Sequence, residues 1–124
     1  MTKPRDPTLD VLLDLDGQVF VVDPKGGYWV RFVVTRVPVS QEKPHGIDYS
    51  LTLHGAGGER LVGFDNTHPV ARQRRGTPQD HRHAPVKPGH LRSTRPYGYR
   101  DAATLLADFW TTVDAVLRER GVIP

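Results

Sequence analysis

Hydrophobic and polar residues alternate most regularly in "GIDYSLTLH", residues 46–54. The odd-numbered positions from Ile47 to Leu53 are apolar, and the positions between them are polar. Side chains of a strand point to opposite faces in turn, so this pattern predicts a strand with one buried face and one wetter face. The wetter face, which includes His54, is the natural place for a functional site.

Three further segments are rich in β-branched and aromatic residues. Residues 15–24 predict a short strand, and the "PKGG" that follows at 24–27 predicts a turn. Residues 28–37 form a nearly continuous apolar run, which predicts a longer strand inside a sheet. The glycine-rich "GAGG" at 55–58 predicts a hairpin connection to a returning strand at 59–66.

The pattern changes to a helical period in "RDAATLLADFWTTVDAVLRERG", residues 100–121. Asp101 is suited to cap the start of this helix, and Gly121 is suited to the left-handed position after its end. The apolar residues recur every three or four positions and form one stripe: Ala102, Leu105, Leu106, Phe109, Val113, Val116 and Leu117.

This order of elements predicts an α+β fold. We expect an antiparallel sheet of about four to five strands, within residues 17–66, and one C-terminal helix, about 101–120, packed on one face. Between them lies a loop-rich segment, 67–100, in which the residues around His81–His83 have the pattern of a further strand. The length of the chain suits a single domain over residues 1–124.

Charge is distributed unevenly along the chain. The net charge is +3, yet residues 72–100 hold eight Lys or Arg residues and one acidic residue, a net of +7. Concentrated positive charge favours a polyanionic partner, and RNA is the one we expect.

The absence of cysteine excludes disulfides and thiolate metal sites. No apolar run reaches the ~20 residues of a membrane span, and no signal peptide is evident, so we expect a cytoplasmic protein without a membrane partner.

The basic segment contains "DHRH", residues 80–83, which is the sharpest candidate for chemistry. In an extended chain His81 and His83 point to the same face, and imidazole transfers protons near neutral pH. We therefore interpret them as the candidate acid–base pair. Asp65 and His68, in "FDNTH", are further candidate catalytic residues that would orient this site.

Other residues of suitable type complete a hypothetical RNA-cleaving site. Arg82 and Arg95 are candidate phosphate contacts, since a phosphorane transition state needs fixed positive charge. Tyr97 could stack on an unpaired base, and His54 would converge on the site from the sheet. A His-x-His pair with an acid could instead hold a metal ion. Because no fixed ligand spacing is evident, we assign no metal ligands and expect no cofactor.

Five motifs together resemble the TumE-like family, the toxin components of bacterial type II toxin–antitoxin modules. The resemblance covers roughly residues 17–121. It implies a small growth-inhibiting protein, with a cognate antitoxin that is often a helix-turn-helix-like protein. It carries no catalytic residues over. The motifs occur in this order: "PHGIDYSLTLH" (44–54), "GFDNTH" (63–68), "DHRH" (80–83), "PYGYRD" (96–101) and "LLADFWTTVD" (105–114).

The sequence thus favours a type II toxin that acts on RNA as a metal-independent endoribonuclease. Two alternatives remain: a non-catalytic basic module that binds nucleic acid or protein, and a metal-dependent nuclease. The ribonuclease step is inferred from residue types alone. Whether copies of the chain associate into a homo-oligomer is left open.

Overall fold

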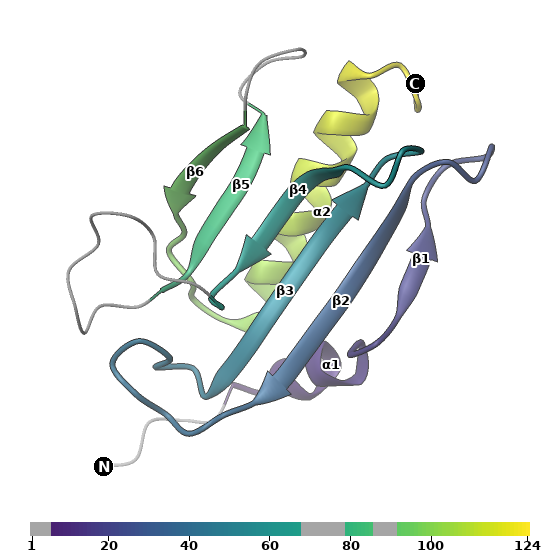
Figure 1. The fold of residues 1–124 in the computed structure, drawn as a ribbon. Coiled ribbons are helices and arrows are strands. Elements are labelled where there is room, and N and C mark those ends of the chain that lie inside the picture. The colour runs from purple at the N-terminus through teal and green to yellow at the C-terminus, as the bar shows by residue number, and fades with distance from the viewer. Residues whose placement is uncertain (1–5, 68–78, 86–91) are drawn as a thin grey trace.

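The computed structural model describes residues 6–67, 79–85 and 92–124 of the chain. In this part a short helix is followed by six strands and a long helix (Figure 1). The elements are α1 (Leu9–Asp14), β1 (Val19–Val21), β2 (Trp29–Arg36), β3 (Ile47–His54), β4 (Arg60–Asp65), β5 (His81–Pro85), β6 (Arg92–Pro96) and α2 (Ala102–Glu119). The expected α+β class is confirmed.

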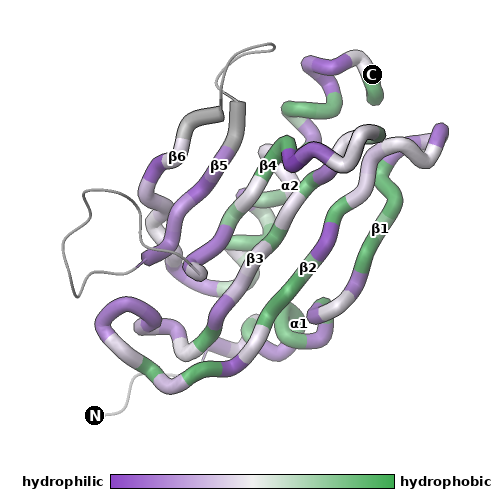
Figure 2. The backbone as a smooth tube through the Cα atoms, viewed as in Figure 1, coloured by the Kyte–Doolittle hydropathy of each residue, from purple (hydrophilic) through white to green (hydrophobic). Residues whose placement is uncertain are grey.

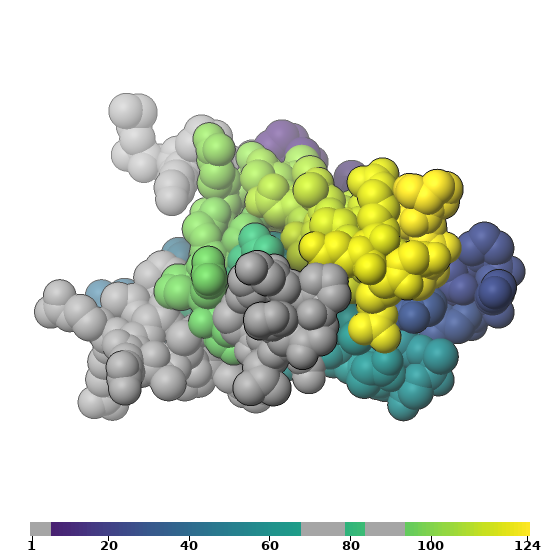
Figure 3. All heavy atoms as spheres, turned by 90° about the horizontal axis from the view of Figure 1, so that it is seen from above, coloured from purple at the N-terminus to yellow at the C-terminus, as the bar shows by residue number. Residues whose placement is uncertain are grey.

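The six strands form one antiparallel sheet, in which their spatial order follows the order along the chain. Both α1 and α2 contribute buried residues to the same core, on one face of the sheet. In the view from above, the yellow atoms of the C-terminal helix lie beside the teal atoms of the β3–β4 hairpin (Figure 3). Among the residues described, no helix covers the other face of the sheet, which we call the open face.

Two elements were not predicted from the sequence. Helix α1 is six residues long and buries Leu9 and Leu12, a pattern too short to stand out from a loop. Strand β6, "RSTRP", has no apolar residue, and its pairing with β5 alone makes it a strand. The expected strand around His81–His83 is confirmed as β5, so the segment expected to be loop-rich holds two strands.

Strand β2 lies inside the sheet as expected, paired with β1 and β3. Val30, Phe32 and Val34 are buried, whereas Val33 is exposed on the open face. Only one side of β2 therefore contributes to the core.

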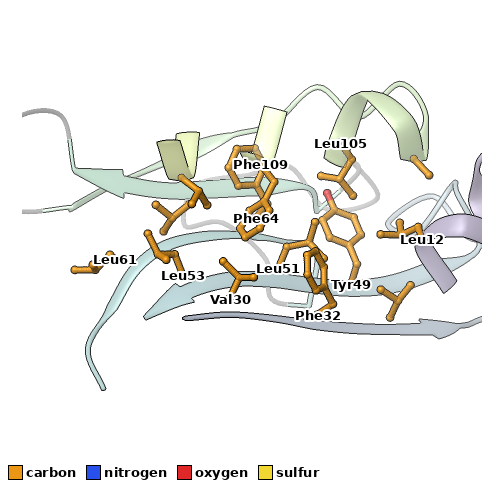
Figure 4. Close-up of a cluster of buried hydrophobic side chains, with 14 of the residues drawn as sticks. Leu12, Val30, Phe32, Tyr49, Leu51, Leu53, Leu61, Phe64, Leu105 and Phe109 are labelled. Carbon is orange, nitrogen blue, oxygen red and sulfur yellow. The ribbon is translucent and has the colours of Figure 1, made fainter. Parts of the chain in front are cut away.

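The core lies between the helices and the face of the sheet that they cover (Figure 4). Phe109 of α2 packs edge-on against Phe32 and Phe64, with ring centroids 5.7 and 6.0 Å apart. The predicted alternation in β3 is confirmed, since its apolar residues are fully buried in this core: Ile47, Tyr49, Leu51 and Leu53.

Strand pairing determines which side chains reach the open face. Leu51 stands opposite Phe64 on the helix side, so their neighbours Ser50 and Asp65, which also pair, point the other way. His81 is paired with Asp65 and shares its face. Along the chain, the described part of β5 is hydrophilic, whereas β2 and β3 carry apolar stretches (Figure 2).

Helix α2 begins and ends as the sequence predicted. The Asp101 side chain accepts a hydrogen bond from the backbone N–H of Thr104 at 2.7 Å, and Gly121 follows the helix with a φ of 72°. A second cap comes from the other end of the chain, because Asp6 accepts from the backbone N–H of Ala102 at 2.8 Å.

In the described part of the chain, neither helix is long and apolar enough to cross a bilayer.

Asn66 extends the pairing of β4 with β3 through its side chain. Its Oδ1 accepts from the backbone N–H of Tyr49 at 2.9 Å, and its Nδ2 donates to the carbonyl of Ile47 at 2.8 Å. The side chain is fully buried, so no solvent can replace either bond. Asn66 therefore satisfies backbone groups of β3 at the point where β4 ends.

We predict that Asn66→Ala lowers the free energy of unfolding by at least about 2 kcal/mol, because each buried polar group left unsatisfied costs about 1–3 kcal/mol. Urea denaturation followed by circular dichroism measures the change. Gln18→Ala, which removes an exposed amide, is the matched control and should stay within about 0.5 kcal/mol of the wild type. Equal stabilities for the two variants would contradict this role of Asn66.

Candidate functional site

The open face carries a cluster of three side chains from two neighbouring strands. Asp65 ends β4, and His81 and His83 lie on β5. Nε2 of His81 lies 2.9 Å from Oδ1 of Asp65, and Nε2 of His83 lies 3.6 Å from Oδ2 of the same carboxylate. The two imidazole rings meet edge to face, with centroids 4.7 Å apart. The structure therefore brings together three of the four predicted catalytic residues. His68, the fourth, lies outside the described residues.

His81 is held on both sides of its ring. Its Nδ1 donates to the backbone carbonyl of Gln79 at 2.7 Å, because a carbonyl oxygen can only accept. Hydrogen bonding to Asp65 therefore requires a second proton between Nε2 and Oδ1. Both residues are 3% exposed, so the pair is shielded from solvent. Removing either partner would leave a buried polar atom of the other without this hydrogen bond, which costs about 1–3 kcal/mol.

His83 is the member of the cluster nearest to solvent, with 17% of its side chain exposed. Its Nδ1 lies 2.8 Å from Oγ1 of Thr94 on β6, which fixes the ring plane. Thr94 stands directly opposite His83 in the strand pairing. The rotamer of His83 is thus set from β6, while its Nε2 faces Asp65.

Arg60 is a basic residue beside the cluster that the sequence did not single out. Gly63 has no side chain, and the space where its Cβ would stand is lined by Cδ of Arg60 and Cδ2 of His83, each 3.5 Å away. The two side chains therefore cover the same glycine. A glycine inside a strand often marks a place where a neighbouring group approaches the backbone closely. Gly63, within the predicted strand 59–66, was therefore the sequence signal that could have pointed to Arg60.

Further polar residues of the open face lie on β3. His54 accepts or donates a hydrogen bond with Thr52 at 2.9 Å and stacks on Trp29 at a centroid distance of 4.1 Å. Thr52 stands opposite Gly63, which stands opposite His83. A row of positions thus crosses the open face from His83 through Thr52 to the stacked pair of His54 and Trp29; we call this row the polar track.

The other predicted substrate contacts lie elsewhere. Arg82 sits on the helix side of the sheet, with its guanidinium 5.3 Å from the ring centre of Phe64. Arg95 is exposed and pairs with Arg82 in the sheet. Tyr97 packs against the core and donates a hydrogen bond to Asp108. Its burial, followed by that hydrogen bond, raises the pKa of its hydroxyl above the ordinary value.

A second polar cluster, unpredicted, holds the start of β5 in place. Asp80 is 2% exposed and accepts a hydrogen bond from the Tyr49 hydroxyl at 2.6 Å. Its other oxygen lies 3.1 Å from Nε2 of His45, whose ring stacks on Tyr99. Asp80 precedes His81 in the chain, so these contacts fix the position from which the histidine strand begins.

The geometry allows two kinds of chemistry. A half-buried imidazole next to a carboxylate and an arginine can move protons at a phosphate. Asp65, His81 and His83 also each offer one metal-ligand atom, and these atoms all lie within 4.8 Å of one another. Among the described residues this is the one group of three or more such side chains with that spacing.

Fold and cluster define a small α+β protein with a polar site on the open face of an antiparallel sheet. The model of the toxin TumE family matches residues 14–117, most of the chain. The chain therefore belongs to the TumE toxin family, as its motifs predicted. This membership supports a toxin role and an antitoxin partner. No curated protein and no solved structure was found to match the chain.

We predict that Tyr49→Phe lowers the free energy of unfolding by about 1.5–3 kcal/mol at neutral pH, since it removes a hydrogen bond to a charged group. It should also reduce the loss of stability in alkali. Burial, and then the charge of Asp80, raise the pKa of Tyr49 above that of an unfolded tyrosine, about 10.

This stabilisation of the neutral hydroxyl is fully present below pH ~10 and is lost as the pH rises further, because the unfolded chain then releases the proton first. Urea unfolding at neutral and alkaline pH measures both effects. A variant with the wild-type slope of stability against pH would contradict the assignment.

Proposed function

We propose that this TumE-family toxin cleaves RNA at the cluster of Asp65, His81 and His83, without needing a metal ion. The observation that carries the proposal is the setting of His83. Its ring is half-buried, held by Thr94, directed at a buried carboxylate and adjacent to Arg60. The basic residues of segment 72–100 favour a polyanionic substrate.

In the proposed reaction His83 accepts the proton of an RNA 2′-hydroxyl. The 2′-oxygen attacks the adjacent phosphorus, the bond from phosphorus to the 5′-oxygen breaks, and the departing oxygen takes a proton from solvent. The products are a 2′,3′-cyclic phosphate and a 5′-hydroxyl. A carboxylate 3.6 Å away, on Asp65, favours the positive charge that His83 gains.

The other predicted residues take supporting roles. His81 is too deeply buried to meet RNA directly, so we assign it to positioning Asp65. Arg60 supplies positive charge for the phosphate. Arg95 pairs with Arg82 and so shares the helix side, from which it would contact RNA only beyond the edge of the sheet. His54, stacked on Trp29, lies on the track where a neighbouring nucleotide would bind. Arg82 and Tyr97, on the helix side, would contact RNA only beyond the edge of the sheet.

We further propose that the toxin acts in the cytoplasm and is restrained there by a small helix-turn-helix-like antitoxin. A toxin that cuts cellular RNA must be inactive while its partner is present. Covering the open face would achieve this, because the proposed site lies there. Relief of growth arrest on co-expression would support the pairing.

We predict that His83→Gln lowers kcat for RNA cleavage in EDTA by about 10²–10⁴-fold, the usual contribution of a general acid–base group. Gel analysis of a defined RNA, with mapping of the new ends, measures the effect. His54→Gln should instead raise KM with little change in kcat. Asp14→Asn, which removes an exposed carboxylate from α1, is the control and should leave kcat and KM unchanged.

Intact RNA under these conditions, with a protein that still arrests growth, would overturn the ribonuclease proposal. Wild-type toxicity and unchanged RNA binding by His83→Gln would favour the alternative of a non-catalytic binding module.

We predict that Arg60→Gln weakens RNA binding and makes it less salt-dependent. Loss of one phosphate contact should reduce the slope of log K against log salt by about 0.7 for a single strand. Fluorescence anisotropy at several salt concentrations measures this slope. Arg118→Gln, which removes an exposed charge from α2 on the helix side, should leave the slope unchanged. Equal slopes for the two variants would place the phosphate elsewhere.

A further inference from the structure

We propose that Asp65, His81 and His83 form a binding site for one divalent transition metal ion of the Zn²⁺ class, and that this ion inhibits the toxin. The binding follows from the geometry of the cluster alone. The inhibition rests on the proposed function, because the ion would occupy the imidazole that the reaction uses.

The donor atoms select the class of ion. Two imidazole nitrogens and one carboxylate oxygen suit Zn²⁺, Co²⁺, Ni²⁺ or Fe²⁺, whereas Mg²⁺ and Ca²⁺ prefer sites made of oxygen alone. All three side chains come from paired positions of β4 and β5, so the backbone that carries them is rigid. A site on paired strands needs little reorganisation before an ion binds.

The spacing of the donors fits a small ion. Zinc lies about 2.0–2.2 Å from nitrogen and oxygen ligands, so tetrahedral neighbours are about 3.4 Å apart. The two separations from the Asp65 oxygens to the imidazole Nε2 atoms are 2.9 Å for His81 and 3.6 Å for His83. All donor atoms lie within 4.8 Å of one another, so small side-chain rotations suffice to close the site.

The outer contacts of the histidines form an independent argument. Ligating histidines usually turn their second nitrogen towards an oxygen, which fixes the tautomer and the ring. Here Nδ1 of His81 donates to the Gln79 carbonyl at 2.7 Å, and Nδ1 of His83 lies 2.8 Å from the Thr94 hydroxyl. Both Nε2 atoms therefore face the carboxylate. Oδ1 of Asp65 is itself bonded to the backbone N–H and the hydroxyl of Thr67, each at 3.3 Å.

The cluster is buried on one side and open to solvent on the other, which suits a metal ion with three protein ligands and one water ligand. Asp65 and His81 are buried, so a cation there gains from a weakly screened negative charge. His83 is partly exposed and marks the side from which an ion enters. A fourth position on this side would take water, as in zinc sites with three protein ligands.

The test is a titration of the full-length, metal-free protein with Co²⁺, whose visible absorption reports the number and geometry of its ligands, and with Zn²⁺ by calorimetry. We expect one ion per chain. His83→Gln should lose the Co²⁺ spectrum. Thr94→Val, which leaves all three ligands in place, should weaken binding about 10–100-fold, the usual effect of removing an outer contact.

Asp14→Asn is the control, because it removes an exposed carboxylate from α1, away from the cluster. It should bind metal like the wild type. Circular dichroism confirms that each variant is folded. Absence of stoichiometric binding, or equal binding by His83→Gln and the wild type, would overturn the site.

An RNA-cleavage assay run in parallel separates this inference from the proposed function. Cleavage in EDTA that falls as Zn²⁺ saturates the protein supports both. Metal binding without cleavage under any condition supports the site and overturns the ribonuclease. Cleavage that requires the ion supports the site but overturns both the inhibition and the metal-independent reaction. Cleavage in EDTA without metal binding overturns the site alone.

Discussion

Strand β5 pairs with β4 so that His81 stands opposite Asp65 and Arg82 stands opposite Phe64. The rest of the structure depends on this register. A shift by one residue would turn both histidines towards the helices and carry Arg82 to the open face. In such a shifted register Asp65 would have no imidazole partner on its own face of the sheet. The pairing also delivers His83 to Thr94 on β6, so one register assembles the whole cluster.

Asp80 and its partners hold this register from one end. The chain enters β5 through Asp80, whose carboxylate is fixed by Tyr49 of β3 and by His45. The two buried aspartates therefore have different tasks. Asp80 attaches the strand to the core, and Asp65 receives the histidines that the strand presents. Buried polar groups of this kind are costly unless satisfied, and here each has its partners.

Much of the fold could be predicted from the sequence, because period-two and helical patterns are local. Strand β3 and helix α2 have the positions and buried faces that residues 46–54 and 100–121 indicated. Helix α1 offers only two buried leucines, and β6 has no apolar residue at all. Their structure comes from contacts with distant parts of the chain, which no local pattern contains.

The candidate site was predictable only in part for the same reason. Alternation placed His81 and His83 on one face, and residue types suggested Asp65 as their neighbour. The position of Arg60 depends on the missing side chain of Gly63 and on the pairing of two strands. Arg82 and Arg95 were grouped with the histidines by composition, yet alternation carries Arg82 to the opposite face. Charge along a sequence does not tell which side of a sheet receives it.

The two edge strands of the sheet, β1 and β6, each oppose the addition of a strand from another chain, and they do so in different ways. Strand β1 is apolar and exposed but only three residues long, which gives another chain few backbone groups to pair with. Strand β6 is longer, but it carries two arginines and ends in proline. Charge and proline at an edge oppose the addition of further strands. The sheet formed by the six described strands thus opposes aggregation at both edges, by shortness at one and by composition at the other.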